Sequence, residues 1–256
     1  MLTVCSRLGM LKSTPSSLWY VGLLVVLLGS ASCEEKPSSV PHALPERSAS
    51  DSPATATSHA AIAYEPKVVF LGDSISAGLH LDAEEAYPAV VERTLRAQGL
   101  PFRLANAGVS GDTSAGGLAR LPWILKQKPA IVVVELGAND GLRGVLLASV
   151  EDNLRAILLQ LRDNGATTLL LGMRLPSNYG SEYTDAFYAL YPRLAEELHV
   201  ALVPWFMEGV AGIAAMNLPD GLHPTAEGHR VLAARVAKAL APLVAAAHKA
   251  HVPPAP

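Results

Sequence analysis

The chain has 256 residues, of which 50% are hydrophobic, 17% are charged and 5% are aromatic. This length suits one domain with or without appended segments, and the apolar content is sufficient for a sizeable core. A formal net charge of −3 and a pI near 6.2 provide no basic surface, so we expect no nucleic-acid partner. The two cysteines, Cys5 and Cys33, precede the predicted globular part, which excludes a cysteine nucleophile and cysteine-ligated metal chemistry from it.

Residues 1–33 are predicted to be an export signal. The apolar stretch 18–28 is shorter than the roughly 20 residues of a spanning helix, which favours a cleaved signal. Small residues lead to Cys33, and this site resembles the lipobox of bacterial lipoproteins, although Ser30 stands where that motif prefers leucine. We expect an exported bacterial protein, periplasmic and anchored to the membrane through a lipid on Cys33. The alternative is a plain signal-peptidase site and a secreted protein.

Residues 34–66 are rich in Ser, Ala, Pro and Thr and show no apolar periodicity. Such a composition cannot bury enough apolar surface to fold, so we interpret this segment as a flexible tether. It would let a domain stand off a membrane surface. The domain itself is predicted to span residues 67–248, followed by a disordered tail, 249–256.

Within the predicted domain, five apolar runs are expected to be strands, and amphipathic segments between them are expected to be helices. The strands are 67–71, 102–106, 130–136, 167–172 and 201–203, and the helices are 83–98, 114–126, 149–164, 185–198 and 225–247. Alternation of strand and helix predicts an α/β fold with a five-stranded parallel sheet and helices on both faces. Ligands of such folds bind at the carboxyl ends of the strands.

The first strand runs into Gly72-Asp73-Ser74. A serine at a strand-to-helix turn has an exposed Oγ and a backbone N–H among the free amides of a helix start, which suits a nucleophile. The alternative interpretation is a turn in which Asp73 or Ser74 is only a helix cap. The second strand is followed by Ser110-Gly111-Asp112-Thr113, where we expect Gly111 to present an N–H to this serine while Asp112 caps the next helix. The alternative is only a capped helix start, with Asp112 or Thr113 as the cap.

Two further motifs follow later strands. Asn139, after the central strand, is a neutral N–H donor of the kind that an oxyanion requires, although alone it would be a turn residue beside Asp140. Asp220 precedes His223 by three residues, within reach of the imidazole ring, and could fix its tautomer. Pro224 is predicted at the first position of the final helix; the alternative is turn chemistry with a capping histidine.

Together these motifs resemble the SGNH (GDSL) hydrolase superfamily, and within it the bacterial periplasmic thioesterase/lysophospholipase-type arylesterases. The matching stretches are 72–74, 110–113, 137–140 and 220–224, with 116–122, 141–144 and 174–180 typical of that subgroup. The resemblance covers roughly residues 67 to 243. Ile75 replaces the leucine of the signature, and Ala138 stands where a second glycine is common.

The resemblance implies a three-layer α/β/α, flavodoxin-like fold. It implies that Ser74 is the nucleophile, that His223 is the base and that Asp220 orients it. The Ser74 N–H, the Gly111 N–H and Asn139 would form the oxyanion hole. We expect no cofactor, no metal and a monomer.

The expected reaction is hydrolysis of a small acyl ester, a lysophospholipid or an acyl thioester through an acyl-serine. Substrate-binding candidates are Asp73 and apolar residues of two loops, Leu142 and Leu146 in one, and Leu175 and Pro176 in the other. One alternative is an O-acetylesterase acting on cell-envelope polysaccharide, which the low aromatic content disfavours. A second is a non-catalytic surface lipoprotein that keeps a relic triad.

The remaining histidines of the domain have no partner in these motifs. His80, His199 and His229 are predicted at the surface or at helix caps, and His248 and His251 in or near the tail.

Overall fold

The computed structural model describes residues 64–251. In that range five parallel strands form one sheet in the order β2-β1-β3-β4-β5. The strands are β1 (Lys67–Gly72), β2 (Arg103–Gly108), β3 (Ile131–Glu135), β4 (Thr167–Leu171) and β5 (Ala201–Val203). The predicted α/β fold with a five-stranded parallel sheet is confirmed. The predicted signal, Cys33 and all but the last three residues of the predicted tether lie outside the described residues.

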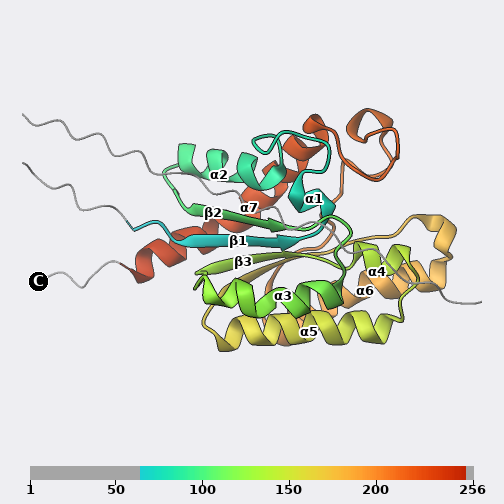
Figure 1. Cartoon of the computed structure of the whole chain (residues 1–256), viewed down its shortest axis with the longest axis horizontal. Coiled ribbons are helices and arrows are strands. Elements are labelled where there is room, and N and C mark those ends of the chain that lie inside the picture. The colour runs from blue at the N-terminus through green and yellow to red at the C-terminus, as the bar shows by residue number, and fades with distance from the viewer. Residues whose placement is uncertain (1–63, 252–256) are drawn as a thin grey trace, which may run out of the picture. The chain divides into compact units, whose positions relative to one another are not determined.

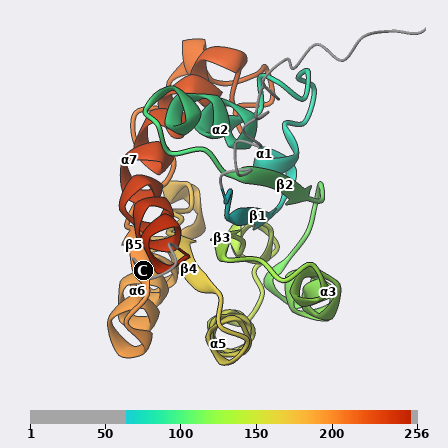
Figure 2. The ribbon, with the colours of Figure 1, turned by 90° about the vertical axis from the view of Figure 1, so that its left-hand side faces the viewer.

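Helices cover both faces of the sheet (Figures 1 and 2). On one face α2 packs against α7, and on the other α3, α5 and α6 lie side by side. The long helices are α2 (Tyr87–Ala97), α3 (Ser114–Lys126), α5 (Leu147–Asp163), α6 (Ser181–Leu198) and α7 (Ala226–Ala250). Short elements at the strand ends are α1 (Ser74–Ala77), α4 (Ala138–Leu142), η1 (Ser177–Tyr179) and η2 (Ala214–Met216).

The central strand β3 is buried along its whole length, as its continuous apolar sequence predicts for a strand covered on both faces. Aromatic side chains fill the two layers between sheet and helices. In the layer beneath α2, Tyr87 contacts both Phe70 and Phe206 edge to face. In the layer beneath α6, Phe187 contacts Tyr191 in the same way.

Helix α7 is the one described helix with the length and apolar composition of a membrane span. Its apolar side chains serve the core: Leu232, Val236, Leu240 and Val244 are buried on the face that packs against α2 and the sheet. Core packing therefore accounts for its composition.

Several predicted boundaries were wrong. Helix α7 begins at Ala226 behind its cap Thr225, so Pro224 is not its first residue and pairs instead with Asn217 in an isolated bridge. The same helix continues to Ala250, past the predicted domain end at 248, because its last turn has partners in the fold. The ring of His248 contacts the carbonyl of Pro101, and His251 stacks on Tyr64.

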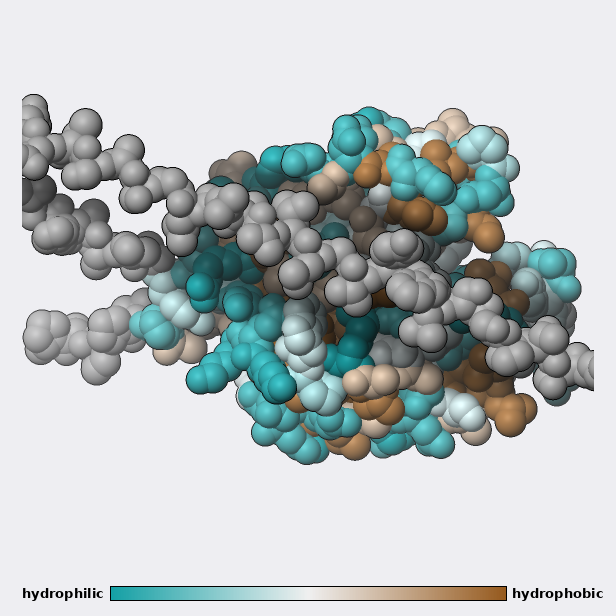
Figure 3. Space-filling model, viewed as in Figure 1, coloured by the Kyte–Doolittle hydropathy of each residue, from teal (hydrophilic) through white to brown (hydrophobic). Residues whose placement is uncertain are grey.

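The carboxyl ends of the strands meet at one edge of the sheet, shown at the right in Figure 1. The strand order reverses between β1 and β3, and ligands of such folds bind at the carboxyl ends of the strands beside this switch point. In Figure 3 hydrophobic surface gathers toward this end of an otherwise largely hydrophilic face. Five exposed large apolar side chains stand on loops that follow these strand ends: Val109, Leu146, Tyr179, Ile213 and Leu222.

Candidate active site

Ser74 is the first residue of α1, directly after the turn that ends β1. Asp73 caps this short helix by accepting the N–H of Ile75 at 2.9 Å. Asp73 is therefore a helix cap, as the alternative interpretation of this turn predicts. It leaves Ser74 at the helix start with its hydroxyl free for another partner.

That partner is His223. The Ser74 Oγ lies 2.8 Å from His223 Nε2, and His223 Nδ1 lies 2.7 Å from Asp220 Oδ2. If Nδ1 carries the proton and donates it to the carboxylate, Nε2 is left as an acceptor for the serine hydroxyl. The structure thus brings together the three side chains that the sequence predicts as nucleophile, base and orienting carboxylate.

The turn from Asp220 to His223 is held by the carboxylate itself. Asp220 Oδ1 accepts the N–H groups of Leu222 at 2.8 Å and His223 at 3.0 Å. These donors and the imidazole hold the pKa of Asp220 well below its ordinary value, with the backbone N–H of His223 the largest cause. The carboxylate therefore stays ionised and can stabilise an imidazolium.

The predicted oxyanion hole includes two backbone N–H groups, those of Ser74 and Gly111. Within residues 64–251, neither Ser74 N–H nor Gly111 N–H has a protein acceptor. Gly111 has a φ of 78°, a conformation that favours glycine and sets the direction of its amide. The cap of α3 is Thr113, which accepts the N–H of Gly116, and not Asp112.

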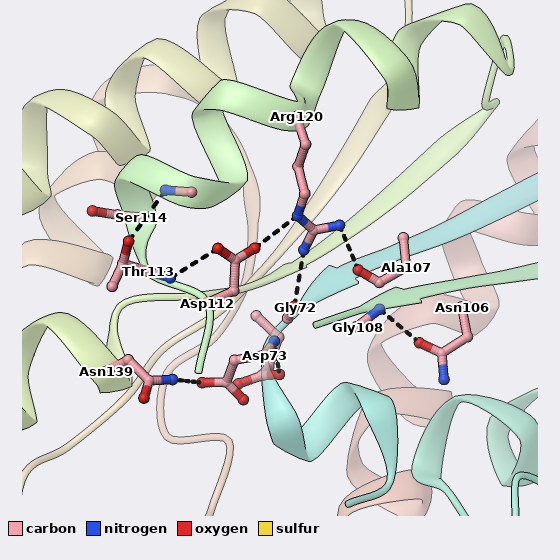
Figure 4. Close-up of polar contacts among 12 residues, drawn as sticks. Gly72, Asp73, Asn106, Ala107, Gly108, Asp112, Thr113, Ser114, Arg120 and Asn139 are labelled. Atoms are coloured by element: carbon pink, nitrogen blue, oxygen red, sulfur yellow. Dashed lines mark hydrogen bonds and ion pairs between the residues drawn. The ribbon is translucent and has the colours of Figure 1, made fainter. Parts of the chain in front are cut away.

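The third predicted oxyanion donor, Asn139, lies in the first turn of α4. Its Nδ2 donates to Asp73 Oδ2 at 3.0 Å, and the amide group retains a second N–H (Figure 4). Asp73, predicted as a substrate-binding candidate, is 1% exposed and accepts protein N–H groups on both oxygens. Its carboxylate joins the nucleophile helix to Asn139.

A second buried acid lies beneath the nucleophile. Glu135, the last residue of β3, accepts the N–H groups of Asp73 and Ser76 and the Ser76 hydroxyl on one oxygen, Oε2. Burial, together with the charge of Asp73, raises the pKa of Glu135 well above its usual range. Burial also raises the pKa of Asp73, to about 6.

The apolar substrate-binding candidates lie on two neighbouring loops at the same sheet edge. Leu146 is 76% exposed, whereas Leu142 and Leu175 are half-buried and Pro176 is exposed. Two tyrosines connect these segments by hydrogen bonds. Tyr179 of η1 donates to the Leu142 carbonyl and Tyr183 of α6 donates to the Val145 carbonyl, each at 3.0 Å.

A hollow of about 550 Å³ lies between the start of α5 and the η1–α6 segment, and it is lined mainly by apolar and aromatic residues. Its lining includes Leu147, Tyr179, Tyr183 and Ala186. Within residues 64–251, no group of three His, Cys, Asp or Glu side chains is placed to hold a metal ion.

Sequence reasoning missed three residues that support the site: Glu135, Arg120 and Asp140. Glu135 is a charged residue ending a buried apolar strand, a signal that was available. Asp140 accepts the Ser114 N–H and hydroxyl at 2.8 and 2.7 Å and so ties α3 to the Asn139 turn. The contacts of Arg120 depend on tertiary placement. The predicted surface position of His229 was wrong: it is 1% exposed, and its Nδ1 accepts the Tyr87 N–H.

Comparison with known proteins agrees with this geometry. Residues 70–231 match the GDSL-like Lipase/Acylhydrolase family. The chain is 46% identical over 178 residues to Esterase TesA of Pseudomonas aeruginosa, covering 69% of this chain and 89% of that protein. It is 45% identical over 178 residues to Thioesterase 1/protease 1/lysophospholipase L1 of Escherichia coli K12, covering 69% and 84%.

A solved structure is also similar. The crystal structure of TesA superposes with a TM-score of 0.67 at 46% sequence identity, covering 69% of this chain and 99% of that one.

Proposed function

The chain belongs to the GDSL-like lipase/acylhydrolase family and is an ester hydrolase, and from this premise we propose that Ser74, His223 and Asp220 catalyse its reaction through an acyl-serine. The observation that carries the proposal is the continuous relay from Ser74 Oγ to His223 Nε2 at 2.8 Å and from His223 Nδ1 to Asp220 Oδ2 at 2.7 Å.

In the acylation step, His223 Nε2 removes the hydroxyl proton while Ser74 Oγ attacks the ester carbonyl carbon. The carbonyl oxygen becomes an oxyanion, which the Ser74 N–H, the Gly111 N–H and Asn139 stabilise. The imidazolium then gives its proton to the leaving alcohol or thiol, and the acyl group remains on Ser74. A water molecule, deprotonated by His223, then attacks the carbonyl carbon of the acyl-serine. The carboxylic acid is released, and the serine hydroxyl regains its proton from His223.

We propose that the acyl group is an apolar chain. The proposal is supported by Leu142 and Leu146, which follow Asn139 in the chain, and by the hollow lined by Tyr179 and Tyr183, which donate to the carbonyls of Leu142 and Val145. The proteins similar to this chain are named for esterase, thioesterase and lysophospholipase activities. Small acyl esters and lysophospholipids are therefore the substrates that we propose.

A chain-length series tests this function. Hydrolysis of p-nitrophenyl acetate, octanoate and palmitate, a lysophospholipid and an acetylated glycan would be compared for wild type and Ser74→Ala. We expect turnover of the longer esters by wild type and none by Ser74→Ala. Full activity in Ser74→Ala would overturn the assignment of the nucleophile. Preference for the acetylated glycan would overturn the apolar acyl chain and favour an O-acetylesterase.

We also propose export of the chain and lipidation of Cys33, with residues 34–66 as a tether. The proposal rests on the sequence preceding the domain. Fractionation of cells that express wild type and Cys33→Ala tests it. We expect wild type in the membrane fraction, carrying lipid, and the variant in the soluble fraction; mature wild type without lipid would overturn it.

A further inference from the structure

The Arg120 side chain of α3 contacts two segments of the candidate active site, the turn after β1 and the segment from the end of β2 to the start of α3 (Figure 4). We call these two segments the catalytic loops. Its Nε pairs with Asp112 Oδ2 at 2.7 Å, and its two terminal nitrogens donate to the Ala107 carbonyl at 2.6 Å and the Gly72 carbonyl at 3.0 Å. All three of these contacts are with residues at the carboxyl edge of the sheet. These partners include none of Ser74, His223 and Asp220, so Arg120 acts through other groups.

Each acceptor lies in the chain segment that leads to or follows a residue of the proposed oxyanion hole. The Gly72 carbonyl closes β1 two residues before Ser74, and the Ala107 carbonyl lies at the end of β2. Asp112 directly follows Gly111. One guanidinium therefore joins the turn that carries the Ser74 N–H to the loop that carries the Gly111 N–H.

The local sequence leaves the Asp112 carboxylate available for this contact. Thr113 caps α3 with its side chain, and Asp112 accepts the Thr113 N–H on Oδ1 at 3.1 Å, which leaves Oδ2 available to Arg120. A Cβ on Gly116 would lie 1.8 Å from Asp112 Oδ1, so only glycine at that position admits the carboxylate where it stands. Arg143 holds the other side of the loop by donating to the Gly111 carbonyl at 3.1 Å.

Charge and burial make the contact a strong one. The Arg120 side chain is 21% exposed and that of Asp112 is 10% exposed, so solvent competes little with the pair. The planar guanidinium directs its N–H groups in fixed directions, which a lysine ammonium cannot reproduce. Loss of the guanidinium would leave the Ala107 carbonyl and Asp112 Oδ2 without the N–H groups that Arg120 donates to them.

We propose that Arg120 is a positioning residue of the oxyanion hole, fixing the Gly111 N–H relative to the Ser74 N–H. The inference rests on the proposed function of Ser74 and Gly111. Because the two amides are fixed to separate loops, their mutual placement is set by what joins those loops. A shift of a donor by a fraction of an ångström weakens transition-state binding more than ground-state binding.

Arg120→Met tests the proposal, with Arg155→Met as the matched control. Arg155 of α5 is also a helix arginine in ion pairs and is 27% exposed, but its partners, Glu151 of α5 and Glu197 of α6, belong to helices and not to the strand-end loops. Both full-length variants would be assayed for kcat and KM on p-nitrophenyl octanoate. Inhibition by an alkyl trifluoromethyl ketone, which forms an oxyanion on serine, would be compared with inhibition by an unreactive ether of the same chain.

For Arg120→Met we expect kcat to fall about tenfold to a hundredfold and the ketone to bind more weakly by a similar factor. KM and the ether inhibition constant should stay within about threefold of wild type. Arg155→Met should match wild type in all four measurements, and Arg120→Lys should show the same split with a smaller loss.

Unchanged kcat in Arg120→Met, or equal weakening of ketone and ether, would overturn the inference. If Arg120→Met does not fold, Arg120→Lys decides: normal kcat per active site, counted by phosphonate titration, would overturn it. An active wild type with an unaffected variant refutes this inference alone. A wild type without esterase activity refutes the proposed function, and this inference with it.

Discussion

His229 gives a direct test of the electrostatics of the core beside the site. Its ring is 1% exposed, and its Nδ1 accepts the Tyr87 N–H at 3.0 Å. Burial, with a smaller contribution from the charge of His223, lowers the pKa of His229 to about 4 from an ordinary value of 6.5. Between these two values the unfolded chain binds more protons at this residue than the native protein does.

The sign of the effect follows from that difference. Because folding lowers the pKa of His229, this residue costs almost no unfolding free energy above pH 6.5. As the pH falls from 6.5 toward 4, protons bind preferentially to the unfolded chain and the unfolding free energy decreases. At about pH 5 the unfolded imidazole is almost fully protonated, while about a tenth of the native imidazole is. The linkage amounts to about 2 kcal/mol of lost unfolding free energy at that pH.

The perturbation is His229→Asn, whose Oδ1 can replace Nδ1 as acceptor of the Tyr87 N–H without titrating. Urea unfolding of both full-length proteins would be measured at about pH 7.5 and about pH 5. The cost of the smaller side chain is present at both pH values, and other groups such as Asp73 titrate in both proteins. Wild type should lose about 2 kcal/mol more than the variant on acidification. Equal losses in the two proteins would refute the reasoning.

Three further outcomes are expected. Asn139→Ala should lower kcat on a p-nitrophenyl ester by on the order of 10²–10³, because an oxyanion donor is removed; a change below about threefold would contradict this role. Asp220→Asn should lower kcat by on the order of 10³–10⁴ with little change in KM, because the neutral amide can donate an N–H to His223 Nδ1 and so favour the tautomer that carries its proton on Nε2. Leu154→Ala, at a fully buried position of α5, should lower the urea-derived unfolding free energy by about 2–5 kcal/mol while kcat stays unchanged.

The strands and the site motifs could be predicted from sequence because their signals are local. The continuous apolar run 131–134 is typical of a strand buried on both faces, and β3 has that burial. Ser74, Gly111 and Asn139 each lie a few residues after a strand, so the parallel arrangement of the strands brings them to one edge. The pairing of Asp220 with His223 follows from a spacing of three residues.

The supporting contacts could not be predicted in the same way. Asp112 and Thr113 are both good capping residues, and the choice between them depends on Arg120, which reaches Asp112 from a later turn of α3. His229 has no partner nearby in sequence, and its acceptor role depends on Tyr87, 142 residues away. Such contacts are set by how helices pack on the sheet, which local propensity does not specify.

The central claim, that Ser74 is an activated nucleophile, is tested most directly by covalent labelling. The full-length protein would be treated with a fluorophosphonate, digested and analysed by peptide mass spectrometry. The account predicts one adduct, on the peptide that contains Ser74, slower labelling in His223→Ala and none in Ser74→Ala. An adduct on another residue, or equal labelling of wild type and Ser74→Ala, would contradict it.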